Sequence, residues 1–293
     1  MSKMVRAISD MGGVVISAID STDIVKRMEE IHKTSAVVSA ALGRMLTASQ
    51  LMASTLKSAS DTITLRIKAD GPIGLITVAC DGQGHCKGYV ENNVVEIPLR
   101  RDGKLDVGSA VGRNGQLYVV KDIGMKEPYV GSIPLESGEI AEDITAYYAY
   151  SEQIPTVCAL GVLVNPDLSI KCAGGYLLQL LPGATEEEIS LVENNIKNIP
   201  SITNFFESGH DVYDIINTVM DGFNPSILDE TDVKYQCDCS RERVKKALIS
   251  IGIKDLEMLR DEEDQIEMGC QYCDAKYYFT KKDLDNIIKS LKK

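Results

Sequence analysis

The chain has 293 residues, of which 44% are hydrophobic, and its formal net charge is −12 at pH 7. This hydrophobic content is enough for a buried core, and the length suits about two domains. The negative charge argues against a general nucleic-acid-binding protein, because contacts with phosphates require a basic face.

Two further features of the whole chain narrow the class of protein. We find no apolar run of about 18 residues, the length that a membrane-spanning helix requires. The first residues, MSKMVRAISDMGGVV, lack the long apolar stretch of a secretory signal. We therefore expect a cytoplasmic protein with no membrane partner. In that compartment, eight cysteines favour metal binding, redox chemistry or simple burial over a structural disulfide framework.

The first 178 residues combine patterns that are typical of strands and of helices. Alternating or β-branched apolar runs predict strands at 14–20, 62–70, 116–124, 155–164 and 168–181. Apolar residues at helical spacing predict helices at 22–31, 35–57 and 139–154. Because strands and helices do not alternate regularly, we predict an α+β domain with largely antiparallel sheets over residues 1–178.

Residues 179–232 are predicted to form a helical linker. A helix opens at Thr185, with Glu188 at capping-box spacing, and two shorter helices follow before a polar, turn-rich stretch. These helices are short and amphipathic and have no obvious core of their own, so they must dock on another part of the chain. The charge also shifts here: residues 1–178 carry 17 basic and 20 acidic residues, whereas residues 179–293 carry 14 and 23.

Four of the cysteines form two close pairs in the predicted C-terminal domain, residues 233–293. Cys237 and Cys239 are separated by one residue, and Cys270 and Cys273 follow after 30 residues and are separated by two. This spacing is typical of a structural zinc site, which requires four ligands in a tetrahedron. We expect one zinc ion with these four thiolates as ligands. Metal binding would then supply much of the folding free energy of a region too small to fold by burial alone.

Basic residues follow the first cysteine pair directly. A helix that begins at Ser240 places Arg241 and Arg243 in its first turn, where cations oppose the helix dipole. An anionic zinc–thiolate centre nearby would offset this cost, and Arg241, Arg243, Lys245 and Lys246 would then stabilise the thiolate form. The alternative, which the sequence leaves open, is that these charges form an ordinary solvated helix face.

The segment CDCSRERVKKALISIG…CQYCDAKYYF resembles the redox domain of the heat shock protein 33 family, the redox-regulated bacterial holdase chaperones. The segments SAALGRMLTASQLMASTLK, LRIKADGPIG, GYVEN and GGYLLQLLPGA resemble the rest of that family in the same order. The resemblance implies an N-terminal α+β domain, a helical linker and a C-terminal zinc domain. It also implies ATP-independent holding of unfolded clients under oxidative and heat stress. The absence of a P-loop pattern in the sequence agrees with this implication.

The resemblance further implies a redox switch. In the reduced state Cys237, Cys239, Cys270 and Cys273 bind zinc, and the protein is inactive. Oxidation forms the disulfides Cys237–Cys239 and Cys270–Cys273, and zinc leaves. The zinc domain and linker then unfold, surface for unfolded client proteins is exposed, and the activated chain tends to form a homodimer.

Two other classes of function remain as alternatives. One is an interaction protein with a purely structural zinc ribbon and no redox switching, for which the acidity of residues 179–293 disfavours a nucleic-acid partner. The other is an enzyme, which we do not expect, because four cysteine ligands would close the metal shell that a catalytic zinc keeps open. The C-x-x-C pair also follows an acidic segment rather than a βαβ pattern.

The remaining cysteines have no place in this motif. Cys158 and Cys172 lie in apolar strands and are expected to be buried, as free cysteines commonly are. Cys80 and Cys86 flank a glycine-rich hairpin next to His85, and a second metal site or a disulfide there stays open.

Overall fold

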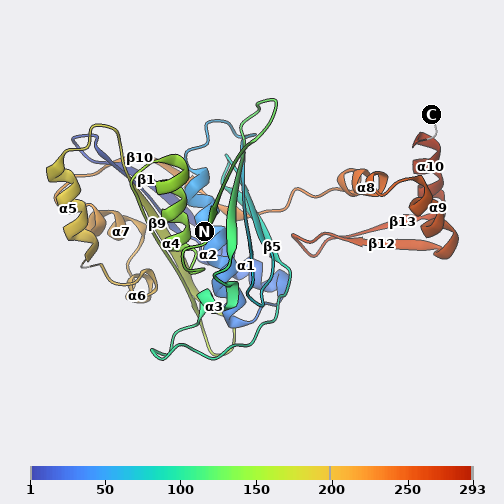
Figure 1. Ribbon diagram of the computed structural model, residues 1–293, viewed down its shortest axis with the longest axis horizontal. Coiled ribbons are helices and arrows are strands. Elements are labelled where there is room, and N and C mark those ends of the chain that lie inside the picture. The colour runs from blue at the N-terminus through green and yellow to red at the C-terminus, as the bar shows by residue number, and fades with distance from the viewer. Residues whose placement is uncertain (1, 198, 292–293) are drawn as a thin grey trace. The chain divides into compact units, whose positions relative to one another are not determined.

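The structure, a computed structural model, describes residues 2–197 and 199–291 (Figure 1). The chain folds as two units, one ending at Gln236 and one beginning at Cys237, and each is described here by itself. Both units mix helices and strands, which confirms the predicted α+β class. The division of the chain at residues 178 and 232 stays a prediction.

A five-stranded antiparallel sheet forms one layer of the first unit, with strand order β10-β1-β2-β9-β8. Its strands are β1 (Lys3–Ile8), β2 (Val14–Asp20), β8 (Thr156–Val164), β9 (Ile170–Leu180) and β10 (Ser226–Asp232). Strand β10 belongs to the stretch that the sequence analysis assigned to the polar linker. As an edge strand it pairs with β1 on one side only, so its polar side chains remain exposed.

A six-stranded sheet forms a second layer, with strand order β11-β5-β4-β3-β6-β7. Its strands are β3 (Thr62–Ala69), β4 (Ile76–Asp81), β5 (His85–Val90), β6 (Gly115–Asp122), β7 (Tyr129–Pro134) and β11 (Lys234–Tyr235). Neighbouring strands are antiparallel except for β11, which lies parallel to β5. Strand β11 thus anchors the chain two residues before Cys237.

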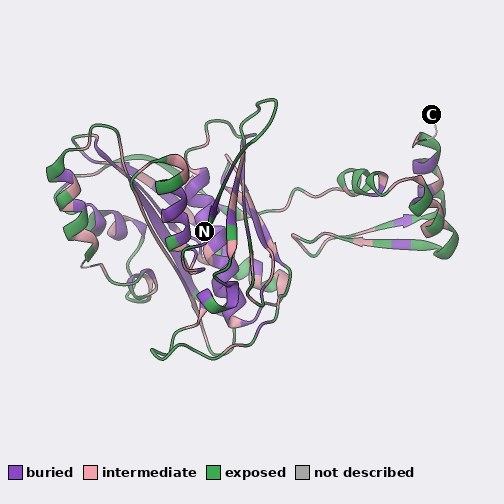
Figure 2. Ribbon diagram, in the orientation of Figure 1, coloured by how far each residue is buried: buried purple, intermediate pink, exposed green. Residues whose placement is uncertain are grey.

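Helix α2 (Ala36–Ala53) lies between the two sheets and fills the main core. It contacts β8 and β9 of the first sheet and β3, β4 and β5 of the second. By length and composition alone, this helix is long and apolar enough to cross a membrane, which differs from the expectation from the sequence. However, 89% of its residues are buried inside the protein (Figure 2). Helix α2 contacts three further helices, which are α1 (Thr22–His32), α3 (Val107–Val111) and α4 (Ala141–Tyr147). A π-helical turn, η1 (Tyr148–Glu152), continues α4.

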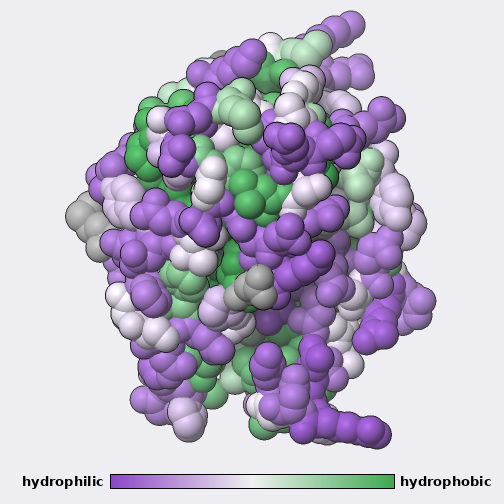
Figure 3. Space-filling view, turned by 90° about the vertical axis from the view of Figure 1, so that its left-hand side faces the viewer, coloured by the Kyte–Doolittle hydropathy of each residue, from purple (hydrophilic) through white to green (hydrophobic). Residues whose placement is uncertain are grey.

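Three helices of the predicted linker segment cover the opposite face of the five-stranded sheet (Figure 1). They are α5 (Glu186–Lys197), α6 (Ile202–Glu207) and α7 (Val212–Val219). The predicted capping box is present, since the Thr185 backbone N–H donates to Glu188 Oε2 (2.9 Å) and the Glu188 N–H donates to Thr185 Oγ1 (3.2 Å). Hydrophilic atoms cover most of the outer side of this layer, with apolar atoms in small groups between them (Figure 3).

The second unit is a β-hairpin with three helices. It contains α8 (Arg241–Ser250), α9 (Ile253–Glu262), β12 (Gln265–Gly269), β13 (Lys276–Thr280) and α10 (Lys281–Leu291). Among its described residues, 237–291, seven apolar residues form a buried core: Leu248, Leu256, Ile266, Phe279, Leu284, Ile287 and Ile288. Burial of a core this small contributes little to the free energy of folding, so a unit of this size usually needs a cross-link such as a bound metal or a disulfide.

Candidate metal centre

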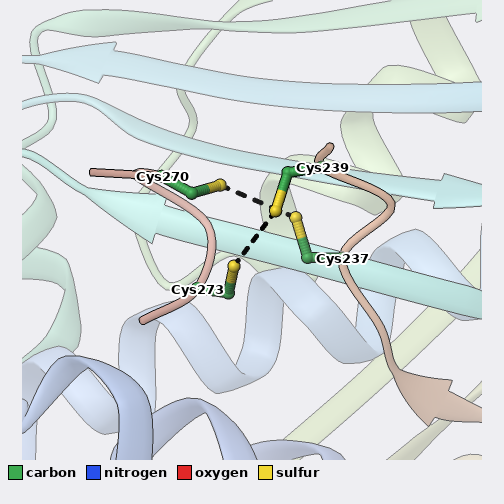
Figure 4. Close-up of side chains that lie close together, drawn as sticks. All are labelled: Cys237, Cys239, Cys270 and Cys273. Carbon is green, nitrogen blue, oxygen red and sulfur yellow. Dashed lines mark hydrogen bonds between the residues drawn. The ribbon is translucent and has the colours of Figure 1, made fainter. Parts of the chain in front are cut away.

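Two segments of the second unit bring the four predicted cysteines together. Cys237 and Cys239 lie on the irregular segment that precedes α8, and Cys270 and Cys273 lie in the turn between β12 and β13. The Cys270 N–H donates to the Ala275 carbonyl (3.0 Å) and closes that turn. All four sulfur atoms lie within 4.8 Å of one another and point toward a common centre (Figure 4).

The distances between the sulfur atoms fit a four-coordinate metal. Cys237 Sγ lies 3.7 Å from Cys270 Sγ, and Cys239 Sγ lies 3.5 Å from Cys273 Sγ. A tetrahedron of thiolates with metal–sulfur bonds of ~2.3 Å has edges of about 3.8 Å. The cluster is therefore consistent with a metal site whose four positions are all taken by protein thiolates.

The four thiols influence one another's ionisation. Burial, and then hydrogen bonding to the neighbouring thiols, raises the pKa of Cys237, and the same causes raise the pKa of Cys273 to about 11. Burial also opposes ionisation of Cys239, but hydrogen bonds from Tyr277 and the other thiols lower its pKa. Ionisation is thus favoured at Cys239 and opposed at Cys237 and Cys273, and a bound divalent cation would displace thiol protons.

A tyrosine that the sequence analysis did not assign to the site contacts one of these sulfurs. The Tyr277 hydroxyl donates a hydrogen bond to Cys239 Sγ (3.0 Å). Strand β13 alternates, so Tyr277 and the buried Phe279 lie on the same face of the hairpin. The alternation in KYYFT is the feature of the sequence from which Tyr277 could have been predicted to share a face with Phe279.

The arginines of the first helical turn have carboxylate partners. Arg241 Nη2 lies 3.0 Å from Asp283 Oδ2, and its guanidinium lies 4.5 Å from the centre of the Phe279 ring. Arg243 forms an ion pair with Asp238. Ser240 is the N-cap of α8, since its hydroxyl accepts from the Arg243 N–H (3.3 Å). Carboxylates therefore offset the helix-dipole cost. Both arginines are exposed, which agrees with the alternative of an ordinary solvated helix face, and no thiolate partner is required to explain them.

A family model described as Hsp33 protein matches residues 2–280. The chain belongs to the Hsp33 family. It is 46% identical over 290 residues to the 33 kDa chaperonin of Clostridium acetobutylicum, covering 99% of this chain and 98% of that protein. It is 45% identical over 288 residues to the 33 kDa chaperonin of Clostridioides difficile, covering 98% and 99%.

A solved structure agrees with this assignment. The crystal structure of the 33 kDa chaperonin (heat shock protein 33 homolog) of Thermotoga maritima superposes with a TM-score of 0.91 at 34% identity, covering 98% of each chain. The predicted family resemblance and fold class are thereby confirmed. As an Hsp33 family member, the chain is a chaperone and not an enzyme.

The remaining cysteines of this Hsp33 chain lie in the first unit. Cys80, Cys86 and Cys172 are buried, whereas Cys158 is only partly buried because β8 is an edge strand. The expectation of burial thus holds for Cys172 and only in part for Cys158. Within residues 2–197 and 199–291, the four-cysteine cluster is the one group of three or more His, Cys, Asp and Glu ligands that gathers closely enough for a metal.

Proposed function

We propose that this Hsp33 chain is an ATP-independent holdase, inactive when reduced and zinc-bound and active when oxidised. The observation that carries the proposal is the four-sulfur cluster, which ties two segments 30 residues apart in a unit with a small apolar core. Zinc is the metal we assign, because structural zinc favours four thiolates and a closed shell. Cys237, Cys239, Cys270 and Cys273 are then both the metal ligands and the redox-active residues.

Oxidation converts the ligands into disulfides and removes the metal. The short sulfur–sulfur contacts run between the two segments, from Cys237 to Cys270 and from Cys239 to Cys273. Disulfides across these contacts would keep the segments tied after zinc leaves. The pairing that we propose, Cys237–Cys239 and Cys270–Cys273, leaves the two cysteine-bearing segments joined neither by a disulfide nor through a metal ion. The second unit then keeps only its small core and unfolds.

Unfolded or partly folded proteins are the proposed partners of the activated chain. The linker helices α5–α7 cover apolar residues of the five-stranded sheet, including Val5, Ile16 and Tyr176. Release of these helices would expose that apolar face to clients and to a second copy of the chain. We therefore include an oxidised homodimer in the proposal, together with a cytoplasmic location and no nucleic-acid or membrane partner.

Suppression of client aggregation tests this function. Reduced protein is expected to leave the light scattering of a heat-denatured client unchanged, and protein treated with hydrogen peroxide at mild heat is expected to suppress it. Cys172→Ser, which removes a thiol outside the cluster, should behave like the wild type. An oxidised sample that stays inert would favour the alternative of a structural zinc-ribbon interaction protein without redox switching.

A further inference from the structure

Two cysteines outside the metal cluster lie directly opposite each other in the six-stranded sheet. The register of β4 and β5 pairs Cys80 with Cys86 across the hairpin. Both side chains are buried, with exposures of 2% and 0%, and both belong to the main core beneath α2. Side chains opposite each other on adjacent strands share one face of the sheet. The two thiols therefore face the same interior space.

The hydrogen-bond pattern shows which kind of cross-strand pair they form. The Glu91 N–H donates to the Leu75 carbonyl (2.8 Å), so these two residues form a hydrogen-bonded pair in the same register. Along two antiparallel strands, hydrogen-bonded and non-hydrogen-bonded pairs alternate. The pair Cys80–Cys86 lies five positions (80 − 75 = 5) from the pair Leu75–Glu91, so it is of the other kind. The Cys86 carbonyl agrees with this assignment, because it accepts from the Gln236 N–H (2.8 Å) on the side away from β4.

Cys80 and Cys86 are therefore a non-hydrogen-bonded pair, the kind in which side chains approach most closely. The Cα atoms of such a pair are about 4.5 Å apart. Disulfides span Cα separations of about 4.4–6.8 Å. The two backbones thus already lie within the range that a disulfide needs.

We propose that Cys80 and Cys86 are a second oxidation site of this chain, at which a hydroperoxide produces a cross-strand disulfide. One sulfur attacks the peroxide, so that an S–O bond forms, the O–O bond breaks and water or an alcohol leaves. The second sulfur attacks the resulting sulfenic acid, an S–S bond forms, and the hydroxyl group leaves as water with the second thiol proton. Two thiols lose two electrons in total, and the peroxide is reduced.

A surface pocket lies next to this pair, and Asp81, the residue that follows Cys80, is part of its lining. It has a volume of about 190 Å³ and is lined in part by Arg6, Asp81, Gly82 and Gly84. This volume is well above the ~10–15 Å³ that one water molecule needs, and the polar lining suits a small hydroperoxide.

Gln50 also lines the pocket and separates it from the thiols. Cys80 Sγ donates to Gln50 Oε1 (3.4 Å), and Gln50 Nε2 donates to the Gly84 carbonyl (2.9 Å). Breaking these two hydrogen bonds would let a peroxide that occupies the pocket reach Cys80.

The site should react more slowly than the metal cluster. Burial raises the pKa of Cys80 well above its usual range and raises the pKa of Cys86 to about 12. Thiolate, the reactive form, is therefore scarce at neutral pH. We expect oxidation to accelerate as the pH rises and to follow that of the four-cysteine cluster in time.

Peptide mapping of the full-length, zinc-loaded protein tests the proposal. After treatment with hydrogen peroxide, free thiols are alkylated and the protein is cleaved with trypsin. Residues 69–87 form one tryptic peptide, with Cys80 and Cys86 as its only cysteines. The expected product is this peptide, lighter by two hydrogens and without alkyl groups. Cleavage before Asp81 should then give two fragments that separate only after reduction.

Two variants serve as controls for the assignment. In Cys86→Ser, the second thiol is missing, so the peptide lighter by two hydrogens should not form and oxidation of Cys80 should stop at the sulfenic acid. In Cys172→Ser, the disulfide should still form, because the residue across the ladder from Cys172 is Leu163. The proposal is overturned if the wild-type peptide keeps two alkylatable thiols after the four-cysteine cluster is fully oxidised. Sulfinic or sulfonic acid at one of the two cysteines, without the disulfide, would also overturn it.

Discussion

Tyr277 acts on the cysteine cluster without being a metal ligand. Its hydroxyl donates to Cys239 Sγ (3.0 Å), and this hydrogen bond helps to lower the pKa of that thiol. Tyr277→Phe removes the donor, so in metal-free protein we expect a higher Cys239 pKa. Each pKa unit reduces the thiolate fraction about tenfold at neutral pH.

The rate at which iodoacetamide alkylates Cys239 in metal-free protein, followed against pH, measures this effect. The profile of Tyr277→Phe should shift to higher pH. Tyr278→Phe is the matched control, because Tyr278 is the next residue of β13 and is exposed. Identical profiles for Tyr277→Phe and the wild type would show that the hydroxyl does not tune the thiol.

Glu188 is a buried carboxylate that secures the start of α5. Oε2 accepts from the Thr185 N–H (2.9 Å), and Oε1 lies 3.4 Å from Ser9 Oγ on the sheet side. Glu188→Ala leaves these donors without partners, so we expect the free energy of unfolding to fall by about 1–3 kcal/mol. Glu187→Ala, at an exposed neighbour, should change it by less than about 0.5 kcal/mol. Equal urea midpoints for the two variants would refute this account of the capping box.

Strand β11 is held in the first unit by a histidine on α1. His32 Nε2 lies 3.2 Å from the Tyr235 hydroxyl, which also bonds to the backbone N–H and carbonyl of Gly88. Burial lowers the pKa of His32 below its usual 6.5, so the folded state favours neutral imidazole. The resulting stabilisation is complete above pH 6.5 and is lost as the pH falls through the lowered pKa.

Unfolding of the wild type and His32→Gln at several pH values tests this coupling. Below pH 6.5 the wild type should lose stability with a steeper pH dependence than the variant. If the wild type and His32→Gln show the same pH dependence of the unfolding free energy below pH 6.5, protonation of His32 does not loosen β11.

At the scale of elements, the sequence predicted what depends on local spacing. The cysteine pairs, the Thr185–Glu188 capping box and the start of a helix at Ser240 each involve residues close in the chain. Long-range pairing was not predictable in the same way. Strand β10 is polar and is ordered by β1, more than 200 residues earlier, and Asp283 reaches Arg241 only after the hairpin folds. The opposition of Cys80 and Cys86 likewise depends on the register of β4 and β5.

Across the whole chain, the negative charge is concentrated before the metal cluster. Residues 179–236 carry 2 basic and 11 acidic residues, whereas residues 237–293 carry 12 of each. The acidity that disfavoured a nucleic-acid partner for the zinc ribbon therefore belongs to the linker helices and β10. This acidic stretch is better suited to remaining hydrated than to binding phosphates.

The central claim is that oxidation removes zinc from the four-cysteine cluster and thereby activates the chaperone. The most direct test follows zinc release, disulfide mapping and suppression of client aggregation in one sample during treatment with peroxide at mild heat. We predict one zinc per reduced chain, released together with formation of Cys237–Cys239 and Cys270–Cys273 and with the onset of suppression. In Cys270→Ser, zinc should be held weakly before oxidation. Suppression while zinc is retained, or complete zinc release without suppression, would contradict the account.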